Sequence, residues 1–77
     1  MNNNYCLRRI RYILDFGDAK MIDVFAQANQ TVTRAEVSAW LKKDDDPDFV
    51  ECPDPMFATF LNGLINDKRG KKDGAQA

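Results

Sequence analysis

The segment covering residues 32–41 of this 77-residue chain constrains the fold most, because it reads as the start of a helix. Thr33 suits the N-cap position, since its hydroxyl can accept a hydrogen bond from the third amide of the helix. Glu36, three residues later, can accept from the backbone N–H of Thr33, and Val32 and Val37 occupy the positions of a hydrophobic staple. Another apolar helical stretch precedes this segment across a short turn, so the pattern predicts a helix-turn-helix outline.

Apolar residues recur with the helical period elsewhere in the chain, and no segment alternates with the period of two that a strand requires. We therefore predict an all-α, helix-turn-helix-like domain with four helices, or five if a short helical turn is added. The predicted helices cover about residues 3–15, 17–28, 33–43 and 54–70. A chain of this length holds one domain. We expect that domain to span residues 1–70 and residues 71–77 to form a flexible tail.

Helical wheels divide the apolar residues into one buried face per helix. The predicted core residues are Cys6, Leu7, Ile10, Ile13 and Leu14 in the first helix, Met21, Ile22, Phe25 and Ala28 in the second, Val37, Trp40 and Leu41 in the third, and Met56, Phe57, Phe60, Leu61, Leu64 and Ile65 in the fourth.

Two further positions carry structural information. The run Asp44-Asp45-Asp46-Pro47-Asp48 predicts an exposed loop, because like charges repel and Pro47 disfavours helical angles in the residue before it. We expect Phe49 and Val50 to hold this loop against the core. Gly63 stands inside a helix, where glycine costs about 1 kcal/mol relative to alanine, which indicates close backbone contact with the first or the second helix.

The charge balance and the cysteines limit the classes of function. A net charge of −1 and a pI near 5.2 provide no long-range attraction to phosphate, so nucleic-acid binding would depend on local clusters of cations. Such clusters lie at Arg8, Arg9 and Arg11, at Lys42 and Lys43, and at the basic end, residues 68–72. Cys6 and Cys52 have no metal-ligand spacing and histidine is absent, so we predict free thiols, no metal site and no cofactor.

An enzyme is the class that the sequence favours least, because neither cysteine has an identifiable base and a chain of this size encloses no deep pocket. No small-molecule substrate is evident. The N-terminal segment lacks the apolar run of a secretory signal, and no stretch approaches the roughly 20 apolar residues that span a bilayer. We therefore expect a cytoplasmic protein that does not contact a membrane.

One candidate interface lies on the first helix. Tyr5, Tyr12 and Phe16 fall on a stripe roughly opposite the core face, with Arg9 beside them. Aromatic residues and arginine are enriched in interface cores, which predicts a contact with a partner protein or with a second copy in a two-fold homodimer. The alternative is that the rings cover a loop or the C-terminal segment of the same chain.

The second candidate surface is the exposed side of the third helix. If this helix enters a major groove of DNA, Arg34, Ser38, Lys42 and Lys43 are the residues that contact it. The alternative is a solvated helix face, since the aspartate run that follows would repel phosphate. The basic end invites a phosphate-binding interpretation too, although favourable charges at a helix C-terminus and a solvated tail explain it as well.

Three segments together resemble a known family. They are Leu7-Arg8-Arg9-Ile10-Arg11-Tyr12-Ile13-Leu14, Val37-Ser38-Ala39-Trp40-Leu41-Lys42-Lys43, and the stretch from Phe60-Leu61-Asn62-Gly63-Leu64-Ile65 to Lys71. The chain resembles the YehS-like family of small bacterial proteins of unknown function, over about residues 2–73. The resemblance implies a bacterial protein and transfers no catalytic residue. Members typically carry two tandem copies of the unit, and this chain resembles the first.

The order of the helices is also similar, more loosely, to repressor domains of the Cro and CI type, in which the third helix reads DNA. The sequence thus leaves two functions open. The first is a non-enzymatic interaction module that uses the stripe on the first helix, and the second is a DNA-binding transcriptional regulator that uses the third helix.

Overall fold

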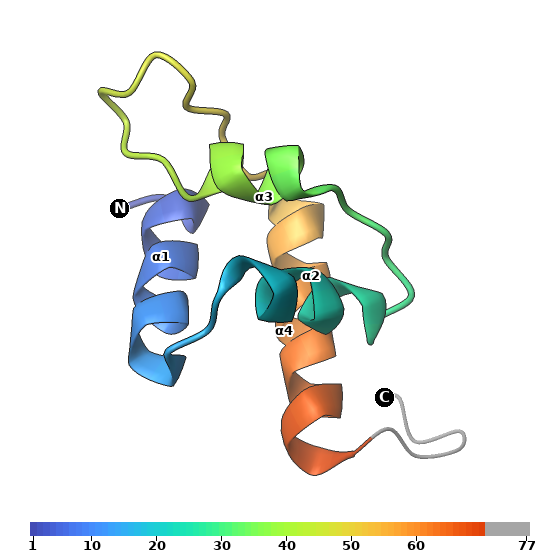
Figure 1. Ribbon diagram of the computed structural model, residues 1–77. Coiled ribbons are helices and arrows are strands. Elements are labelled where there is room, and N and C mark those ends of the chain that lie inside the picture. Colours follow the sequence, from blue (N-terminus) through green and yellow to red (C-terminus); the bar gives the residue numbers. More distant parts are fainter. Residues whose placement is uncertain (71–77) are drawn as a thin grey trace.

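The structure, a computed structural model, describes residues 1–70 of the chain. It contains four helices and, within the described residues, no strand (Figure 1). The helices are α1 (Asn3–Leu14), α2 (Asp18–Ala26), α3 (Arg34–Trp40) and α4 (Asp54–Arg69). The predicted all-α, four-helix class is therefore confirmed. The predicted flexible tail, residues 71–77, lies outside the described residues.

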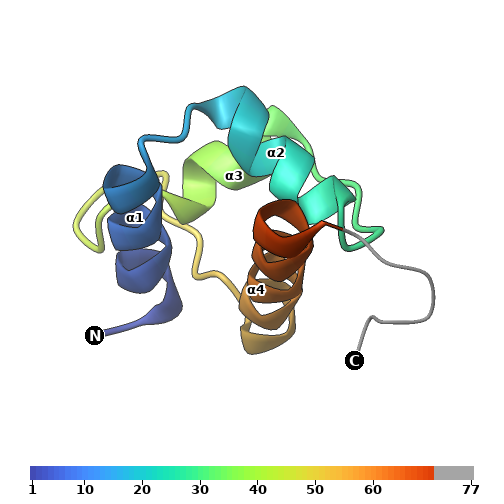
Figure 2. The ribbon, with the colours of Figure 1, turned by 90° about the horizontal axis from the view of Figure 1, so that it is seen from below.

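The helices α1 and α4 run in the same direction, and α2 and α3 bridge them (Figure 1). Seen from below, the helices form an arch with α1 and α4 as its two legs (Figure 2). The ring centroid of Phe25 in α2 lies 5.6 Å from that of Trp40 in α3 and 5.3 Å from that of Phe60 in α4. The Phe25 ring of α2 therefore packs against one ring of α3 and one ring of α4. The buried hydrophobic residues are Leu7, Met21, Val24, Phe25, Val32, Val37, Trp40, Cys52 and Phe60.

Local hydrogen bonds explain where the helices begin. The backbone N–H of Tyr5 donates to the side-chain oxygen of Asn2 at 2.8 Å, which caps α1. The Thr33 hydroxyl accepts from the backbone N–H of Glu36 at 3.1 Å, and the Glu36 carboxylate accepts from that of Thr33 at 2.8 Å, so the predicted capping box is confirmed. The fourth helix begins at Asp54, and its N-cap is Pro53, which provides no side-chain hydrogen bond.

The helix α3 is shorter than predicted and ends at Trp40 instead of near Lys43. Side chains of α1 bind the carbonyl groups at this end. The carbonyl of Trp40 accepts from Asn4 Nδ2 at 2.8 Å, and that of Lys42 accepts from an Arg8 Nη1 at 2.7 Å. Because these carbonyls have long-range donors and the residues that follow are aspartates, the backbone has no need to continue as a helix.

Gly63 lets α2 and α4 approach at backbone distance. A Cβ atom placed on Gly63 would lie 1.9 Å from the carbonyl oxygen of Val24 and 3.2 Å from its Cγ1 atom. Both residues are buried. The predicted close contact is confirmed, and the structure identifies α2 as the neighbour, since the sequence had left α1 and α2 open. Val24, absent from the predicted core, is buried by this contact.

Asn4 is a buried polar residue that joins three segments of the chain. Its Nδ2 donates to the carbonyls of Trp40 at 2.8 Å and Val50 at 2.7 Å, and its Oδ1 accepts from the backbone N–H of Cys52 at 2.8 Å. The backbone N–H of Val50 in turn donates to the carbonyl of Ala39 at 3.3 Å. One α1 side chain therefore closes the base of the loop between α3 and α4.

Some of the predicted core residues are exposed. Ile13 is 75% exposed, because it lies about 120° around α1 from the buried Leu7 and only one side of this helix is covered. Ile65 is 51% and Leu61 38% exposed, because the packed side of α4 is centred on Phe60 and Gly63. The prediction that the Val50 side chain pins the loop was also wrong. Its side chain is exposed, and its backbone makes the contact.

Candidate binding groove

An open groove lies between α1 and the C-terminal end of α3. Its volume is about 620 Å³. It joins residues from both candidate surfaces of the sequence, since Arg9 and Tyr12 line it together with Ser38, Lys42 and Lys43. We call this hollow the basic groove. Its full lining is Arg8, Arg9, Arg11, Tyr12, Asp18, Ser38, Leu41, Lys42 and Lys43.

The hydrogen bond from Arg8 to the Lys42 carbonyl holds the two walls of the groove together. A guanidinium has five N–H donors, and this contact uses one nitrogen of Arg8 on the groove wall. Arg8 and Lys43 also line a neighbouring hollow that extends toward Tyr5 and toward Asp44 at the base of the acidic loop. The basic surface therefore continues past the groove to the start of the loop.

The cations of the groove are not neutralised within the described chain. The ion pairs in residues 1–70 join Lys20 to Asp23 and to Asp67, so none of the five cations of the groove forms one. The Nε atom of Arg11 is buried and has no hydrogen-bond partner among the described residues. A buried donor without a partner is costly.

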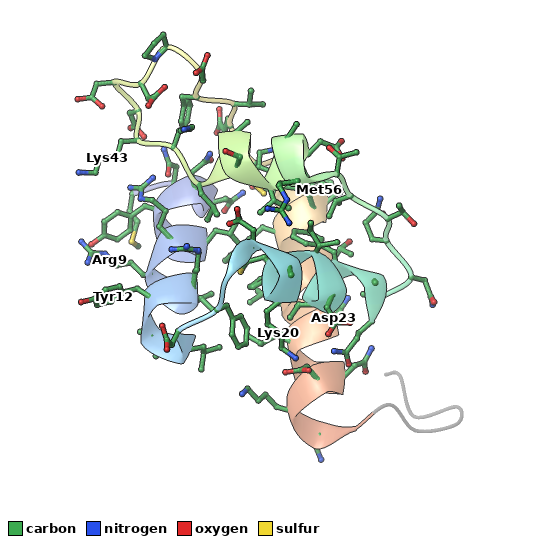
Figure 3. All side chains as sticks on the ribbon, in the orientation of Figure 1. Arg9, Tyr12, Lys20, Asp23, Lys43 and Met56 are labelled. Atoms are coloured by element: carbon green, nitrogen blue, oxygen red, sulfur yellow. The ribbon has the colours of Figure 1, made fainter. Side chains whose placement is uncertain are left out.

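Aromatic rings lie beside these cations. The guanidinium of Arg9 stands 4.7 Å from the ring centroid of Tyr5, and that of Arg8 stands 5.8 Å from it. Tyr12 is 81% exposed. Figure 3 shows Arg9, Tyr12 and Lys43 on the same side of the molecule, which faces away from α4. This face combines positive charge with apolar ring surface, the two features that recur in protein interfaces.

Phe16 does not belong to this face. The helix α1 ends at Leu14, and Asp15 adopts a left-handed conformation with φ of 55°. Phe16 therefore leaves the helical wheel on which the stripe was drawn, and its half-buried ring packs against the core. The ammonium groups of Lys20 and Lys68 lie 5.7 Å and 5.6 Å from its centroid. The structure brings Arg9 and Tyr12 into the groove and Tyr5 to its edge, and it separates Phe16 from them.

The residues predicted to contact DNA are also divided. Ser38, Lys42 and Lys43 line the groove, whereas the exposed Arg34 stands at the opposite end of α3. Residues 27–33 separate α2 from α3, a longer connection than the three or four residues typical of a helix-turn-helix. With seven residues, α3 is about 10 Å long. Arg8 and Arg11 were recognised in the sequence as members of a cation cluster but not as site residues, and their proximity to Lys42 and Lys43 depends on contacts that the sequence does not reveal.

The described residues hold no other obvious chemistry. They contain no group of three or more cysteine, aspartate or glutamate residues arranged to hold a metal ion. Burial, with the charge of Asp54 adding to it, raises the pKa of the Cys52 thiol to about 11, so this cysteine is protonated at neutral pH. None of the described helices has the length and the apolar composition needed to cross a bilayer.

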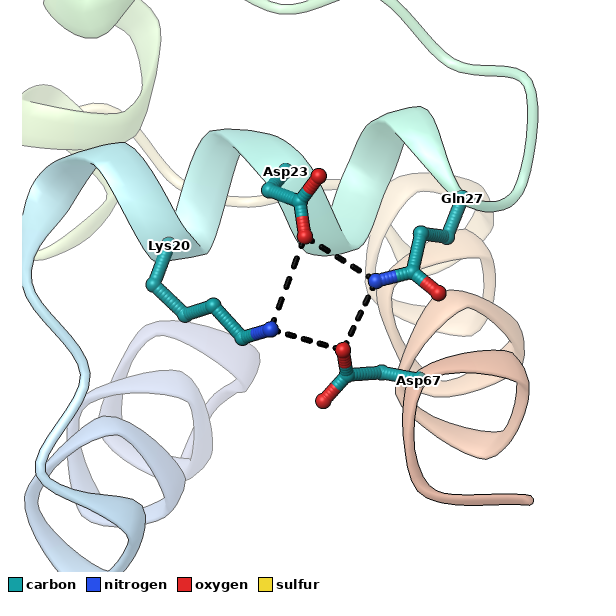
Figure 4. A network of polar contacts seen from close by, with 4 residues as sticks. All are labelled: Lys20, Asp23, Gln27 and Asp67. Carbon is teal, nitrogen blue, oxygen red and sulfur yellow. Dashed lines mark hydrogen bonds and ion pairs between the residues drawn. The ribbon is translucent and has the colours of Figure 1, made fainter. Parts of the chain in front are cut away.

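A second polar cluster links α2 to α4 (Figure 4). The ammonium of Lys20 lies 2.7 Å from Asp67 Oδ1 and 3.5 Å from Asp23 Oδ2, and Gln27 Nε2 donates to Asp67 Oδ1 at 2.8 Å. The hydrogen bond from Lys20, and then that from Gln27, lowers the pKa of Asp67 below its ordinary value of 3.8. The hydrogen bond to Asp67 raises the pKa of Lys20 above 10.5.

These shifts give a prediction of pH dependence. A carboxylate whose folded pKa is lowered contributes stability above its ordinary pKa, and this contribution is lost as the pH falls through the folded pKa. We expect Asp67→Asn to lower the free energy of unfolding at pH 7 by at most about 1 kcal/mol, because the pair is partly exposed. The deficit should be smaller at pH 2.5, because the contribution falls once the pH is below the ordinary pKa of 3.8 and is lost as the pH passes through the lowered pKa of Asp67. Urea denaturation at the two pH values measures it.

Asp23→Asn serves as the control, since Asp23 is more exposed and lies farther from Lys20, so its deficit at pH 7 should be smaller. An Asp67→Asn deficit of equal size at both pH values would contradict the assignment. The stability that Lys20 contributes is present up to its ordinary pKa of 10.5. It is lost as the pH rises through the raised pKa of Lys20 in the folded state.

The described residues thus form a small helical domain with a cationic groove on one face. The chain matches, over residues 3–70, the family described as "Protein of unknown function (DUF1456)", and it belongs to that family. The "Uncharacterized protein YehS" of Escherichia coli (strain K12) is similar to it, with 40% identity over 77 residues. The chain spans about half of this relative, 49% of its length, and no solved structure matches. The resemblance inferred from the sequence is thereby confirmed.

Proposed function

We propose that this chain is a non-enzymatic interaction module that acts in the cytoplasm, and that the basic groove binds an acidic segment of a protein. The observation that carries the proposal is the set of five unpaired cations in one open groove, with the exposed ring of Tyr12 among them. Gathering like charges on one surface is unfavourable in the free protein, so a bound group of opposite charge relieves the repulsion.

An acidic protein segment fits this surface better than a nucleic acid does. The chain has a net charge of −1, and Asp44 and Asp45 line the hollow next to the groove. A phosphate backbone that continues past the groove would meet these carboxylates, whereas a short peptide ends before them. Arg34, the residue expected to reach a DNA base, lies outside the groove. These features favour the interaction module over the DNA-binding regulator.

Tyr12 and the cations have different parts in this function. Exposed tyrosine rings supply apolar contact area at low entropic cost, and such anchors carry much of the binding energy in protein interfaces. The surrounding cations orient the partner and accelerate association. The cytoplasmic location is supported by the free thiols of Cys6 and Cys52, since a reducing compartment keeps cysteines in this state.

The test is the binding of two labelled probes, polyglutamate and mixed-sequence duplex DNA, followed by fluorescence anisotropy. The variant Arg9→Glu with Lys43→Glu reverses two exposed charges of the groove whose side chains make no hydrogen bond to the backbone within residues 1–70. We expect wild type to bind polyglutamate and this variant to bind it about tenfold or more weakly, since each exposed charge pair contributes up to about 1 kcal/mol. Tyr12→Ala should weaken binding as well.

The matched control is Arg34→Glu with Arg69→Glu, which makes the same change in net charge outside the groove and should bind polyglutamate like wild type. Tyr12 is changed alone because Phe16 contacts the core. If the protein binds duplex DNA, and this binding falls steeply with salt and requires Arg9 and Lys43, then the partner of the groove is a nucleic acid and not an acidic protein segment. Failure of polyglutamate to bind both wild type and a variant with a reversed loop charge, Asp45→Lys with Asp48→Lys, would refute the proposal.

A further inference from the structure

The loop between α3 and α4 is acidic, so its charge is opposite to that of the basic groove. Asp44, Asp45, Asp46 and Asp48 follow one another along it, and within residues 1–70 none of the four forms an ion pair. Two of them accept hydrogen bonds from uncharged donors. Asp44 Oδ1 accepts from Asn2 at 3.2 Å, and Asp46 Oδ1 accepts from the backbone N–H of Asp48 at 2.8 Å. An acidic segment and an unpaired basic groove thus lie on the same chain without neutralising each other.

The way in which the loop is held explains why its tip does not fill its own groove. Asn4 and the hydrogen bond between Val50 and Ala39 close the base of the loop. From this base the loop extends away from the helices, beyond the upper end of α1 (Figure 1). Asp45 and Asp48 are exposed, and none of the four loop aspartates is among the residues that line the groove.

We infer that the groove of one copy of this chain receives the acidic loop of a second copy, in a two-fold dimer where each loop occupies the groove of the other. This inference rests on the proposed function and names a partner for the same groove. Reciprocal pairing follows because a two-fold interface makes every contact twice. The charges are complementary, since five cations and Asp18 line the groove and the loop brings four aspartates.

Two further features support association of identical copies. A net charge of −1 means that two copies do not repel strongly at long range. The loop and the groove also offer apolar surface to each other, because Val50 at the end of the loop is 51% exposed and Tyr12 in the groove is exposed. Since the pairing is between solvent-exposed charges, the dimer dissociates as salt is added.

The test is a charge exchange followed by sedimentation velocity. The groove variant carries Arg9→Glu and Lys43→Glu, and the loop variant carries Asp45→Lys and Asp48→Lys. In either variant alone, the reversed residues have the same sign as the residues they would face and the altered surface is left with no net charge, so we expect each variant to dimerise at least about tenfold more weakly than wild type. In an equimolar mixture, one contact of the heterodimer joins an unaltered loop to an unaltered groove and the other joins the two reversed pairs of charges, so the mixture should associate more tightly than either variant alone. The Arg34→Glu with Arg69→Glu variant should dimerise like wild type.

The outcomes separate this inference from the proposed function. A monomeric wild type, a wild-type dimer unaffected by either variant, or a mixture that remains monomeric would overturn the dimer. The loop variant keeps its groove residues, so polyglutamate binding to that variant tests the groove without competition from a loop of opposite charge. If polyglutamate binds but wild type does not dimerise, the proposed function holds and the second copy is not the partner. If polyglutamate does not bind the loop variant, the groove is not a site for acidic segments.

Discussion

Replacing Gly63 by alanine should destabilise the protein by about 3 kcal/mol, the upper part of the range for inserting a group into a packed core. The added Cβ atom would lie 1.9 Å from the carbonyl oxygen and 2.8 Å from the carbonyl carbon of Val24. Both atoms belong to the backbone of α2, so a side-chain rotation cannot relieve the contact and the two helices have to separate. Separation would loosen the buried cluster around Phe25 and Phe60.

Whether Gly63→Ala lowers or raises the free energy of unfolding distinguishes the effect of the contact between α2 and α4 from the effect of helix propensity. Propensity alone predicts that alanine is better than glycine inside a helix by about 1 kcal/mol. Urea denaturation followed by circular dichroism measures the difference in unfolding free energy. Gly17→Ala is the matched control, because a Cβ atom there meets nothing within 4 Å, and its cost should stay below about 1 kcal/mol. A Gly63→Ala variant as stable as wild type would show that α2 and α4 do not touch at this point.

The sequence predicted those features whose causes lie within a few residues. The capping box of Thr33 and Glu36 depends on groups three residues apart, and it forms as predicted. Gly63 was recognised because glycine within a helix has a cost that a close contact explains. The identity of the contacted helix required the structure, since nothing near Gly63 in the sequence refers to Val24.

Long-range contacts account for what the sequence did not predict. A helical wheel places Ile13 and Ile65 on the apolar faces of their helices. Which apolar residues become buried depends on the neighbouring helices, and within residues 1–70 both of these side chains remain exposed. Phe16 was misplaced because Asp15, in a left-handed conformation, ends the helix one residue earlier.

The candidate site was predicted in pieces. Arg9 and Tyr12 were assigned to one surface and Lys43 to another, whereas the structure places all three along one groove. The two surfaces meet because Arg8 donates to the carbonyl of Lys42, 34 positions along the chain. A contact of this kind has no local sequence signal, so a single groove could not be recognised before the helices were placed.

Replacing Asn4 by alanine should lower the free energy of unfolding by about 4 kcal/mol, because each buried polar group left without a partner costs about 1–3 kcal/mol. The substitution removes the partners of three backbone groups, the carbonyls of Trp40 and Val50 and the N–H of Cys52. The exposed Asn62→Ala is the control and should change stability by less than about 0.5 kcal/mol. Thermal and urea denaturation measure both.

Asn4→Asp separates hydrogen bonding from the loss of side-chain volume. An aspartate nearly preserves the shape and can accept from Cys52, but its charged form faces the carbonyl oxygens of Trp40 and Val50 and donates to neither. Burial and these carbonyls favour its protonated form, so its pKa in the folded state should be raised. Compared with wild type at the same pH, the variant should therefore be less destabilised near pH 4 than near pH 7. Its loss of unfolding free energy relative to wild type should grow as the pH rises through the raised pKa. If Asn4→Asp equals wild type at pH 7, the three hydrogen bonds do not hold the base of the loop, and the position of the acidic loop must have another cause.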